Sequence, residues 1–66
     1  MEHTVRYTSE RNGYKVEVYE YTVNRKHGFG TRVTNKTTGN SLQTPGFATY
    51  GTALLVAQQA ADEAQI

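Results

Sequence analysis

Apolar and polar positions follow two different periods along this chain, and the change between them falls near residue 49. Up to that point apolar residues recur at roughly every second position, which is the period of a strand with one covered face. Beyond it they recur at about every 3.6 residues, which is the period of a helix with one covered face. The pattern therefore predicts strands first and a helix last, in an α+β domain.

The clearest strand signal is the run from Tyr14 to Val23, which is rich in β-branched and aromatic side chains. Alternation places Val16 and Val18 on one face of this strand. The opposite face then carries Lys15, Glu17, Tyr19 and Tyr21. Strict alternation would also place Glu20 beside the valines, so we expect a bulge near Val18 to Glu20 that corrects the pattern.

Two further strands are expected within residues 4–44, at residues 5–7 and 29–33, and Leu42 is a candidate anchor of a short fourth strand at residues 41–44. The pair Asn12-Gly13 tolerates positive φ and is typical of a tight hairpin turn. Residues 24–28 and 35–40 are polar, contain glycine and are predicted to be loops. Pro45 and Gly46 are expected to end the last strand, because proline has no amide proton to donate to a sheet.

A helix is predicted over about residues 50–65, with Thr49 as a candidate N-cap and Thr52 as a competing one. Its apolar face comprises Tyr50, Ala53, Leu54, Ala57, Ala60, Ala61 and Ala64. Alanines at these positions would let the helix lie close to a sheet. We therefore expect an antiparallel meander of three to four strands, covered on one face by the C-terminal helix and open on the other.

Composition limits the size of the core and of any site. The chain has 66 residues, of which 36% are apolar, and Leu, Ile, Val and Phe together supply only 12. A net charge of +1 and five tyrosines nevertheless favour a folded chain over a disordered one. We expect residues 1–66 to form one small domain with a thin core, which self-association would help to stabilise.

Several kinds of chemistry lack the residues that they need. The chain has no cysteine, and His3 and His27 lack an acidic partner at metal-ligand spacing. The carboxylate pairs Asp62 with Glu63 and Glu17 with Glu20 do not converge, because their spacing separates them on a helix and on a strand. We expect a protein that is not an enzyme and binds no metal, cofactor or small-molecule substrate. No signal-like or membrane-spanning run is visible, so a cytoplasmic location without membrane contact is expected.

The charges are distributed unevenly along the chain. Residues 1–36 contain all seven Lys and Arg together with four Glu, for a net charge of +3, whereas residues 37–66 carry −2. Tyr19 and Tyr21 could stack on bases while nearby cations contact phosphates. Alternatively, Glu17 and Glu20 pair with the basic side chains across strands and the two rings cover the pleat. A pI of about 8.1 is low for a nucleic-acid-binding domain.

Residues 46–50, Gly-Phe-Ala-Thr-Tyr, and the alanines from Ala53 to Ala61 resemble the last half of a double-stranded-RNA-binding domain. In that family a glycine-containing turn leads into an alanine-rich helix. The family's first helix has no counterpart here, and Tyr50, Gly51 and Thr52 stand where its phosphate-binding lysines would lie. The topology is also similar to sheet-plus-helix DNA-binding modules such as the arm domains of phage integrases. The resemblance implies a similar fold, but the residues that contact RNA in that family are missing here.

Protein contact is the hypothesis that we prefer over nucleic-acid binding. Leu55 lies outside the alanine face of the predicted helix, with Ile66 at the same azimuth, and two tyrosines lie on the open sheet face. We expect a non-enzymatic binding module, a regulator or inhibitor of a larger complex, that contacts another protein or a second copy of itself. The expected partner-binding residues are Tyr19, Tyr21, Lys15, Arg25, Arg32 and Leu55. The alternative is nucleic-acid binding by the same sheet, with Arg25, Lys26, Arg32 and Lys36 on phosphates.

Overall fold

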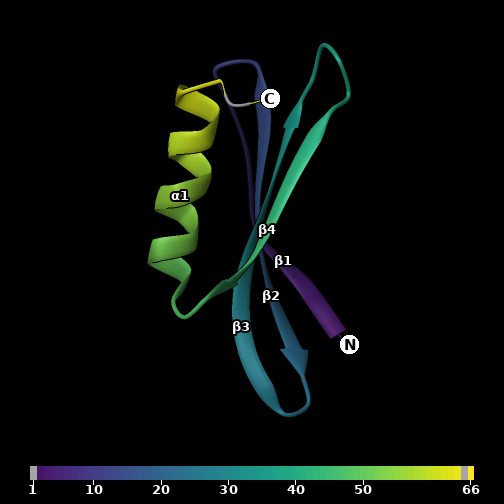
Figure 1. Ribbon diagram of the computed structural model, residues 1–66, viewed down its shortest axis with the longest axis vertical. Coiled ribbons are helices and arrows are strands. Elements are labelled where there is room, and N and C mark those ends of the chain that lie inside the picture. Colours follow the sequence, from purple (N-terminus) through teal and green to yellow (C-terminus); the bar gives the residue numbers. More distant parts are fainter. Residues whose placement is uncertain (1, 65) are drawn as a thin grey trace.

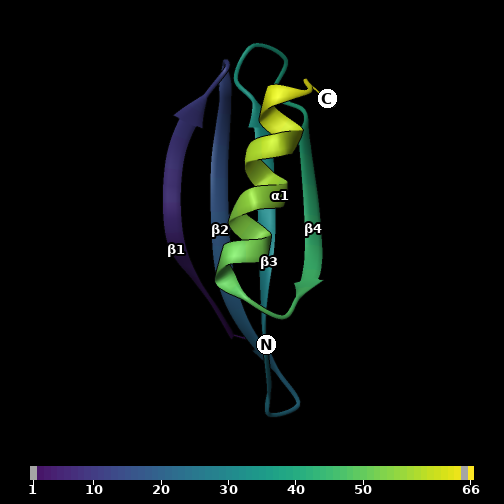
Figure 2. The same cartoon turned by 90° about the vertical axis from the view of Figure 1, so that its left-hand side faces the viewer.

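A computed structural model describes residues 2–64 and 66 of the chain. It contains one antiparallel sheet with the strand order β1-β2-β3-β4 and one helix. The elements are β1 (Glu2–Arg11), β2 (Tyr14–Val23), β3 (Lys26–Asn35), β4 (Ser41–Phe47) and α1 (Tyr50–Asp62). Helix α1 lies along one face of the sheet, across β2 and β3, and leaves the other face uncovered (Figures 1 and 2). The predicted α+β meander with a C-terminal helix is confirmed.

Two-residue turns join the first three strands. Asn12 and Gly13 have φ values of 54° and 82°, so both adopt the left-handed conformation of a tight hairpin turn, as their sequence predicts. The turn between β2 and β3 is equally short, because Asn24 and Arg25 have φ values of 51° and 67°. The predicted loop over residues 24–28 is therefore wrong. Lys26 and the two residues after it belong to β3 and pair with β2.

The expected bulge occurs on the strand next to the one that was predicted to carry it. The register between β2 and β3 is unbroken from Tyr14 to Val23, whereas β1 shifts between Val5 and Tyr7. The extra residue is thus accommodated in β1, and β2 keeps strict alternation. Glu20 consequently stays on the helix side of the sheet. Arg6, in the bulge, binds the Glu20 carboxylate through Nε at 2.9 Å and Nη2 at 2.6 Å.

Strand β4 continues through the residues that were expected to end it. It runs to Phe47, so the predicted end at Thr44 is wrong. Pro45 is tolerated because β4 is an edge strand, where a missing amide proton does not interrupt a ladder. A register shift opposite Phe29 and Thr31 accommodates the proline, and Gly46 adopts a φ of 98°.

The core lies between α1 and the centre of the sheet. Its helical contribution is almost entirely alanine, from Ala53, Ala57, Ala60 and Ala61, as the helical pattern predicts. On the sheet side these small residues meet Tyr14, Val16 and Val33. Because each alanine adds little thickness, the helix packs closely enough to exclude water from the valines. In the part of the chain that the structure describes, no helix is long and apolar enough to cross a bilayer.

The structure defines where α1 begins and where it ends. Thr49 is the N-cap, since its Oγ1 accepts a hydrogen bond from the Thr52 amide at 3.2 Å, and this decides between the two candidate caps. The helix ends at Asp62, a few residues earlier than expected, and Ala64 is exposed with a φ of 52°. Ala64 therefore does not belong to the buried face.

The C-terminal residue folds back onto the sheet. The Ile66 carbonyl oxygen accepts hydrogen bonds from the Tyr14 hydroxyl at 2.6 Å and from Asn35 Nδ2 at 3.0 Å. The Ile66 side chain packs against the core. The expectation that Ile66 shares the outer azimuth of Leu55 is wrong, because the helix has already ended and the chain has turned.

Candidate functional site

The open face of the sheet has a charged half and an aromatic half. The β2–β3 register places Lys15 and Glu17 next to Thr34 and Arg32, which defines the charged half. Further along the same strands Tyr19 lies opposite Gly30 and Tyr21 opposite Gly28. The aromatic half consists of these two rings together with His3, Val5, Val23, Gln43 and Pro45. The predicted assignment of Lys15, Glu17, Tyr19 and Tyr21 to one face holds, and Arg32 joins them.

Both tyrosine rings lie flat across glycines of β3. A methyl group at Gly28 would lie 2.7 Å from the Tyr21 hydroxyl oxygen, and one at Gly30 would overlap the Tyr19 ring. Glycine thus provides the space in which each ring can cover the neighbouring strand. Tyr19 is only 7% exposed, so it is a buried ring and does not project from the sheet. This is the alternative considered above, in which the rings cover the pleat.

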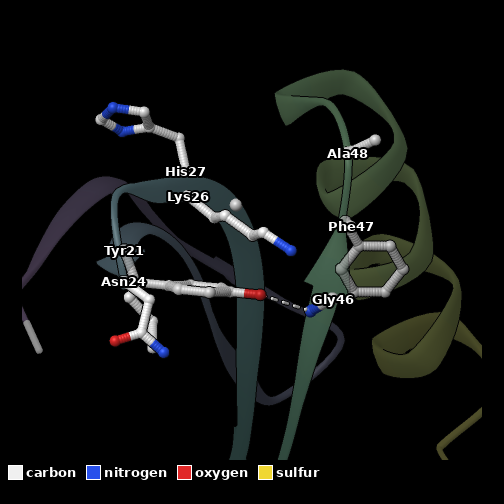
Figure 3. A pocket seen from close by; sticks show the side chains of 9 residues that line it. Tyr21, Asn24, Lys26, His27, Gly46, Phe47 and Ala48 are labelled. Carbon is white, nitrogen blue, oxygen red and sulfur yellow. Dashed lines mark hydrogen bonds between the residues drawn. The ribbon is translucent and has the colours of Figure 1, made fainter.

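The hydroxyl groups of these rings reach across β3 to β4. Tyr19 Oη accepts a hydrogen bond from Gln43 Nε2 at 2.9 Å. Tyr21 Oη accepts one from the Gly46 amide at 3.0 Å (Figure 3). The His3 ring meets the Tyr19 ring edge to face, with centroids 5.5 Å apart. Each ring is therefore held at both ends, and together they form a rigid floor across three strands.

Two cavities adjoin this floor. The first, which we call the tyrosine groove, has a volume of about 610 Å³ and is lined by His3, Tyr19, Tyr21, Val23, Gln43 and Pro45. The second, the hairpin cavity, has a volume of about 470 Å³ and shares Tyr21 and Val23 with the first. Its other lining residues are Asn24, Lys26, His27, Gly28, Gly46, Phe47 and Ala48. Val5 and Val23 remain 46% and 39% exposed on the aromatic half.

Carboxylates neutralise much of the positive charge on the protein. Arg6 pairs with Glu20, Arg11 with Asp62, Arg32 with Glu17 and Lys36 with Glu10, at distances from 2.6 to 4.0 Å. The predicted alternative, in which Glu17 and Glu20 pair with basic side chains across strands, is therefore the observed arrangement. In the charged half Arg32 thus has a carboxylate partner, whereas Lys15 has none within 4.0 Å among the described side chains.

The end of the β2–β3 hairpin carries two adjacent cations. Arg25 and Lys26 are exposed there, and among the side chains that the structure describes no carboxylate lies within 4.0 Å of either cation. Figure 3 shows the Lys26 side chain extended from β3 toward β4 along the hairpin cavity. The aromatic half thus ends in two cations.

The six residues expected to bind a partner do not form one surface. Tyr19 and Tyr21 form the floor of the groove, and Arg25 lies in the turn between β2 and β3, outside its lining. Lys15 and Arg32 belong to the charged half. Leu55 is 57% exposed on the outer side of α1, away from the open face. Sequence reasoning missed His3, Val5, Val23, Gln43 and Pro45. A signal for Val23 was available, because alternation places it on the same face as Tyr21.

The arrangement suits binding through apolar contact and charge. Cavities with an apolar floor and a few fixed polar groups are the usual form of a recognition site. Within residues 2–64 and 66, no three His, Asp or Glu side chains gather as a metal site would require. Comparison of the chain with protein families, with curated proteins and with solved structures finds no match.

Proposed function

We propose that this protein is a non-enzymatic binding module that recognises a segment of another protein through the aromatic half of its open sheet face. The observation that carries the proposal is the rigid tyrosine floor, flanked by the exposed side chains of Val5 and Val23. The fold needs the rings over the glycines, but it gains little from leaving two valines in water. A partner that covered them would bury apolar area on a surface that needs no rearrangement.

Several features support a protein partner over nucleic acid. A ring that is 7% exposed, as Tyr19 is, has almost no free face on which a base could stack. Arg6 and Arg32 are paired with carboxylates, so phosphate contacts along the sheet would first have to break those pairs. The exposed apolar area beside these rings is aliphatic, from Val5 and Val23, and suits apolar side chains better than bases.

A different protein fits the surface better than a second copy. In a symmetric dimer of aromatic halves, each copy would bring the same Arg25 and Lys26. Among the side chains that the structure describes, neither copy would bring an unpaired sheet carboxylate, since Glu10, Glu17 and Glu20 already pair with basic side chains. By occupying a segment of a larger assembly, such a module would act as its regulator or inhibitor.

The first test is a selection of short random peptides displayed on phage against the immobilised protein. Enriched peptides are then synthesised, and their Kd values are measured by fluorescence anisotropy for the wild type and for Val5→Thr/Val23→Thr. Threonine keeps the shape and strand preference of valine but removes apolar surface. We expect the double variant to weaken binding by about tenfold.

The matched control is Leu55→Gln, which removes an exposed apolar side chain from the opposite side of the molecule and should leave the Kd unchanged. Peptides that bind the wild type and the valine variant equally would contradict the proposal.

Light scattering coupled to size exclusion tests the two other partners. The protein is run at two concentrations and two salt concentrations, with and without short DNA and RNA. A protein-segment binder should stay monomeric in every run. A mass increase only with nucleic acid at low salt would favour the nucleic-acid alternative. A dimer at both salt concentrations would assign the aromatic half to self-association.

A further inference from the structure

We propose that the partner segment is extended and carries acidic residues next to its apolar ones, and that these acidic residues bind Arg25 and Lys26. The inference rests on the proposed function of the tyrosine groove and goes beyond it by naming the chemistry of the partner. Three independent observations support it: the continuity of the two cavities, the unmatched charge of the β2–β3 turn, and an interrupted strand edge.

The cavities form one continuous path. Tyr21 and Val23 line both of them, so a segment seated on the tyrosine groove passes directly into the hairpin cavity. The path begins on apolar side chains and ends beside Lys26, which extends along the hairpin cavity (Figure 3). Its occupant should accordingly be apolar at one end and negatively charged at the other.

The cations at the end of this path are held by a tight turn. Arg25 has a φ of 67°, and only Asn24 and Arg25 separate β2 from β3, so the two cations are adjacent at a tight turn. Elsewhere on the sheet, Glu10, Glu17 and Glu20 each bind a basic side chain. Since the described sheet carboxylates are taken, we expect the bound segment to supply the partners of Arg25 and Lys26. Exposed charges of this kind set the orientation and the association rate of a complex.

The edge of β3 indicates how the segment lies. Strand β4 pairs with β3 only from Phe29 to Thr34 and then leaves the sheet after Phe47. Beside β3 residues 26–28, the hairpin cavity occupies the space that a continued β4 would fill. An extended segment placed there could bond to the free strand edge in the manner of strand addition. Lys26 lines that position, and Arg25 precedes it in the turn.

The test uses three matched synthetic peptides with a central Leu-Tyr-Val. Their flanking residues are Glu in the first, Gln in the second and Lys in the third. Each peptide is titrated into the ¹⁵N-labelled protein, with oligothymidylate as a fourth probe, and amide shifts and Kd values are recorded at low and at physiological salt. We expect the Glu peptide to shift the amides of Tyr21, Val23, Gly28 and Gly46. It should bind about tenfold tighter than the Gln peptide at low salt, and the difference should shrink as salt rises.

The charge is tested with Arg25→Asn/Lys26→Gln, because asparagine tolerates the positive φ of residue 25 and the turn should persist. This variant should raise the Kd of the Glu peptide by about tenfold and leave the Kd of the Gln peptide unchanged. The control, Lys15→Gln/Lys36→Gln, removes the same charge from the other end of the sheet and should change neither Kd by more than about twofold. The single variant Lys26→Gln lies in β3, outside the turn, so the Kd of the Glu peptide for this variant tests the same contact without altering the turn.

The outcomes separate the two proposals. Equal binding of the Glu and Gln peptides at the groove would overturn the inference that the segment is acidic, but not the proposal that the protein is a binding module. If none of the peptides shifts the groove amides, both proposals fail. Stronger shifts of the same amides by oligothymidylate than by the Glu peptide would assign the surface to nucleic acid and overturn the inference.

Discussion

The ring of Tyr19 on β2 lies flat across Gly30, its cross-strand partner on β3. Tyr21 repeats the relationship with Gly28, two residues away on each strand. A glycine inside a strand leaves a gap and weakens the sheet, and a neighbouring ring fills that gap. The two pairs thus stabilise the centre of the sheet and also make the smooth floor on which the proposed partner is seated.

Substitution of Gly30 by alanine should destabilise the protein by about 1–3 kcal/mol, because the added methyl group displaces the Tyr19 ring from a packed position. Gly30 is not among the glycines with positive φ, so its backbone conformation is compatible with alanine. The loss of stability then arises from displacement of the Tyr19 ring alone. Denaturation by guanidinium chloride measures the change. In a Tyr19→Thr background the same substitution should be close to neutral, and an equal loss in both backgrounds would contradict the pairing.

Tyr19 and Tyr21 should differ in their importance for stability. Tyr19 is buried, whereas Tyr21 lies closer to the edge of the aromatic half and is partly exposed. Tyr19→Ser should therefore cost about 3–5 kcal/mol, in the range of a large side chain removed from a core, and Tyr21→Ser distinctly less. Thermal melts followed by circular dichroism give the ranking. A greater loss of stability for Tyr21→Ser would show that the more exposed ring contributes more to the stability of the sheet.

Local sequence predicted the elements and their faces because those features depend on near neighbours. The alternation of Val16 and Val18, the Asn12-Gly13 turn and the Thr49 cap are each decided within a few residues. The wrong predictions concern features that depend on pairing with a strand distant in sequence. An irregular period shows that two strands differ by one residue but not which strand contains the extra one, so the bulge was placed in β2 instead of β1.

The candidate site shows the same limit. Gly28 and Gly30 explain Tyr21 and Tyr19 only once the β2–β3 register is known. Pro45 is compatible with a strand only if that strand lies at an edge, which the order of the sheet decides. Ile66 is held by Tyr14 and Asn35, whose positions in sequence give no hint of the contact. Alternation alone could have indicated Val23, which lies two residues after Tyr21 on the same strand.

Asn12 should contribute to stability in two separable ways. Its φ of 54° forms the first hairpin turn, and its Nδ2 donates to the Ala61 carbonyl oxygen at 2.9 Å, near the end of α1. Asn12→Gly keeps the turn and loses the bond, which should cost about 0.5–1.5 kcal/mol. Asn12→Ala loses both and should cost about 1 kcal/mol more, since alanine disfavours positive φ. Chemical denaturation of the two variants separates the effects, and equal losses would show that only the hydrogen bond matters.

Acid should destabilise the protein through two exposed ion pairs. Arg11 binds both oxygens of Asp62 at 2.6 and 2.8 Å, and the Lys36 ammonium lies 2.8 Å from Glu10. The hydrogen bond from Arg11 lowers the pKa of Asp62 below its ordinary 3.8, and the one from Lys36 lowers the pKa of Glu10 below 4.5. A depressed pKa means that the folded state holds its proton less tightly than the unfolded state does.

The stabilisation from these carboxylates should therefore be complete above their ordinary pKa values and disappear as the pH falls through the lowered ones. We expect the Tm to be level from pH 7 to about pH 5 and to decline below about pH 4, with a smaller decline at high salt. Asp62→Asn/Glu10→Gln should have a lower Tm at pH 7 and a shallower decline in acid, because it lacks both titrating groups. Melts of the two proteins across this range check the assignment, and parallel acid declines would place the titrating groups elsewhere.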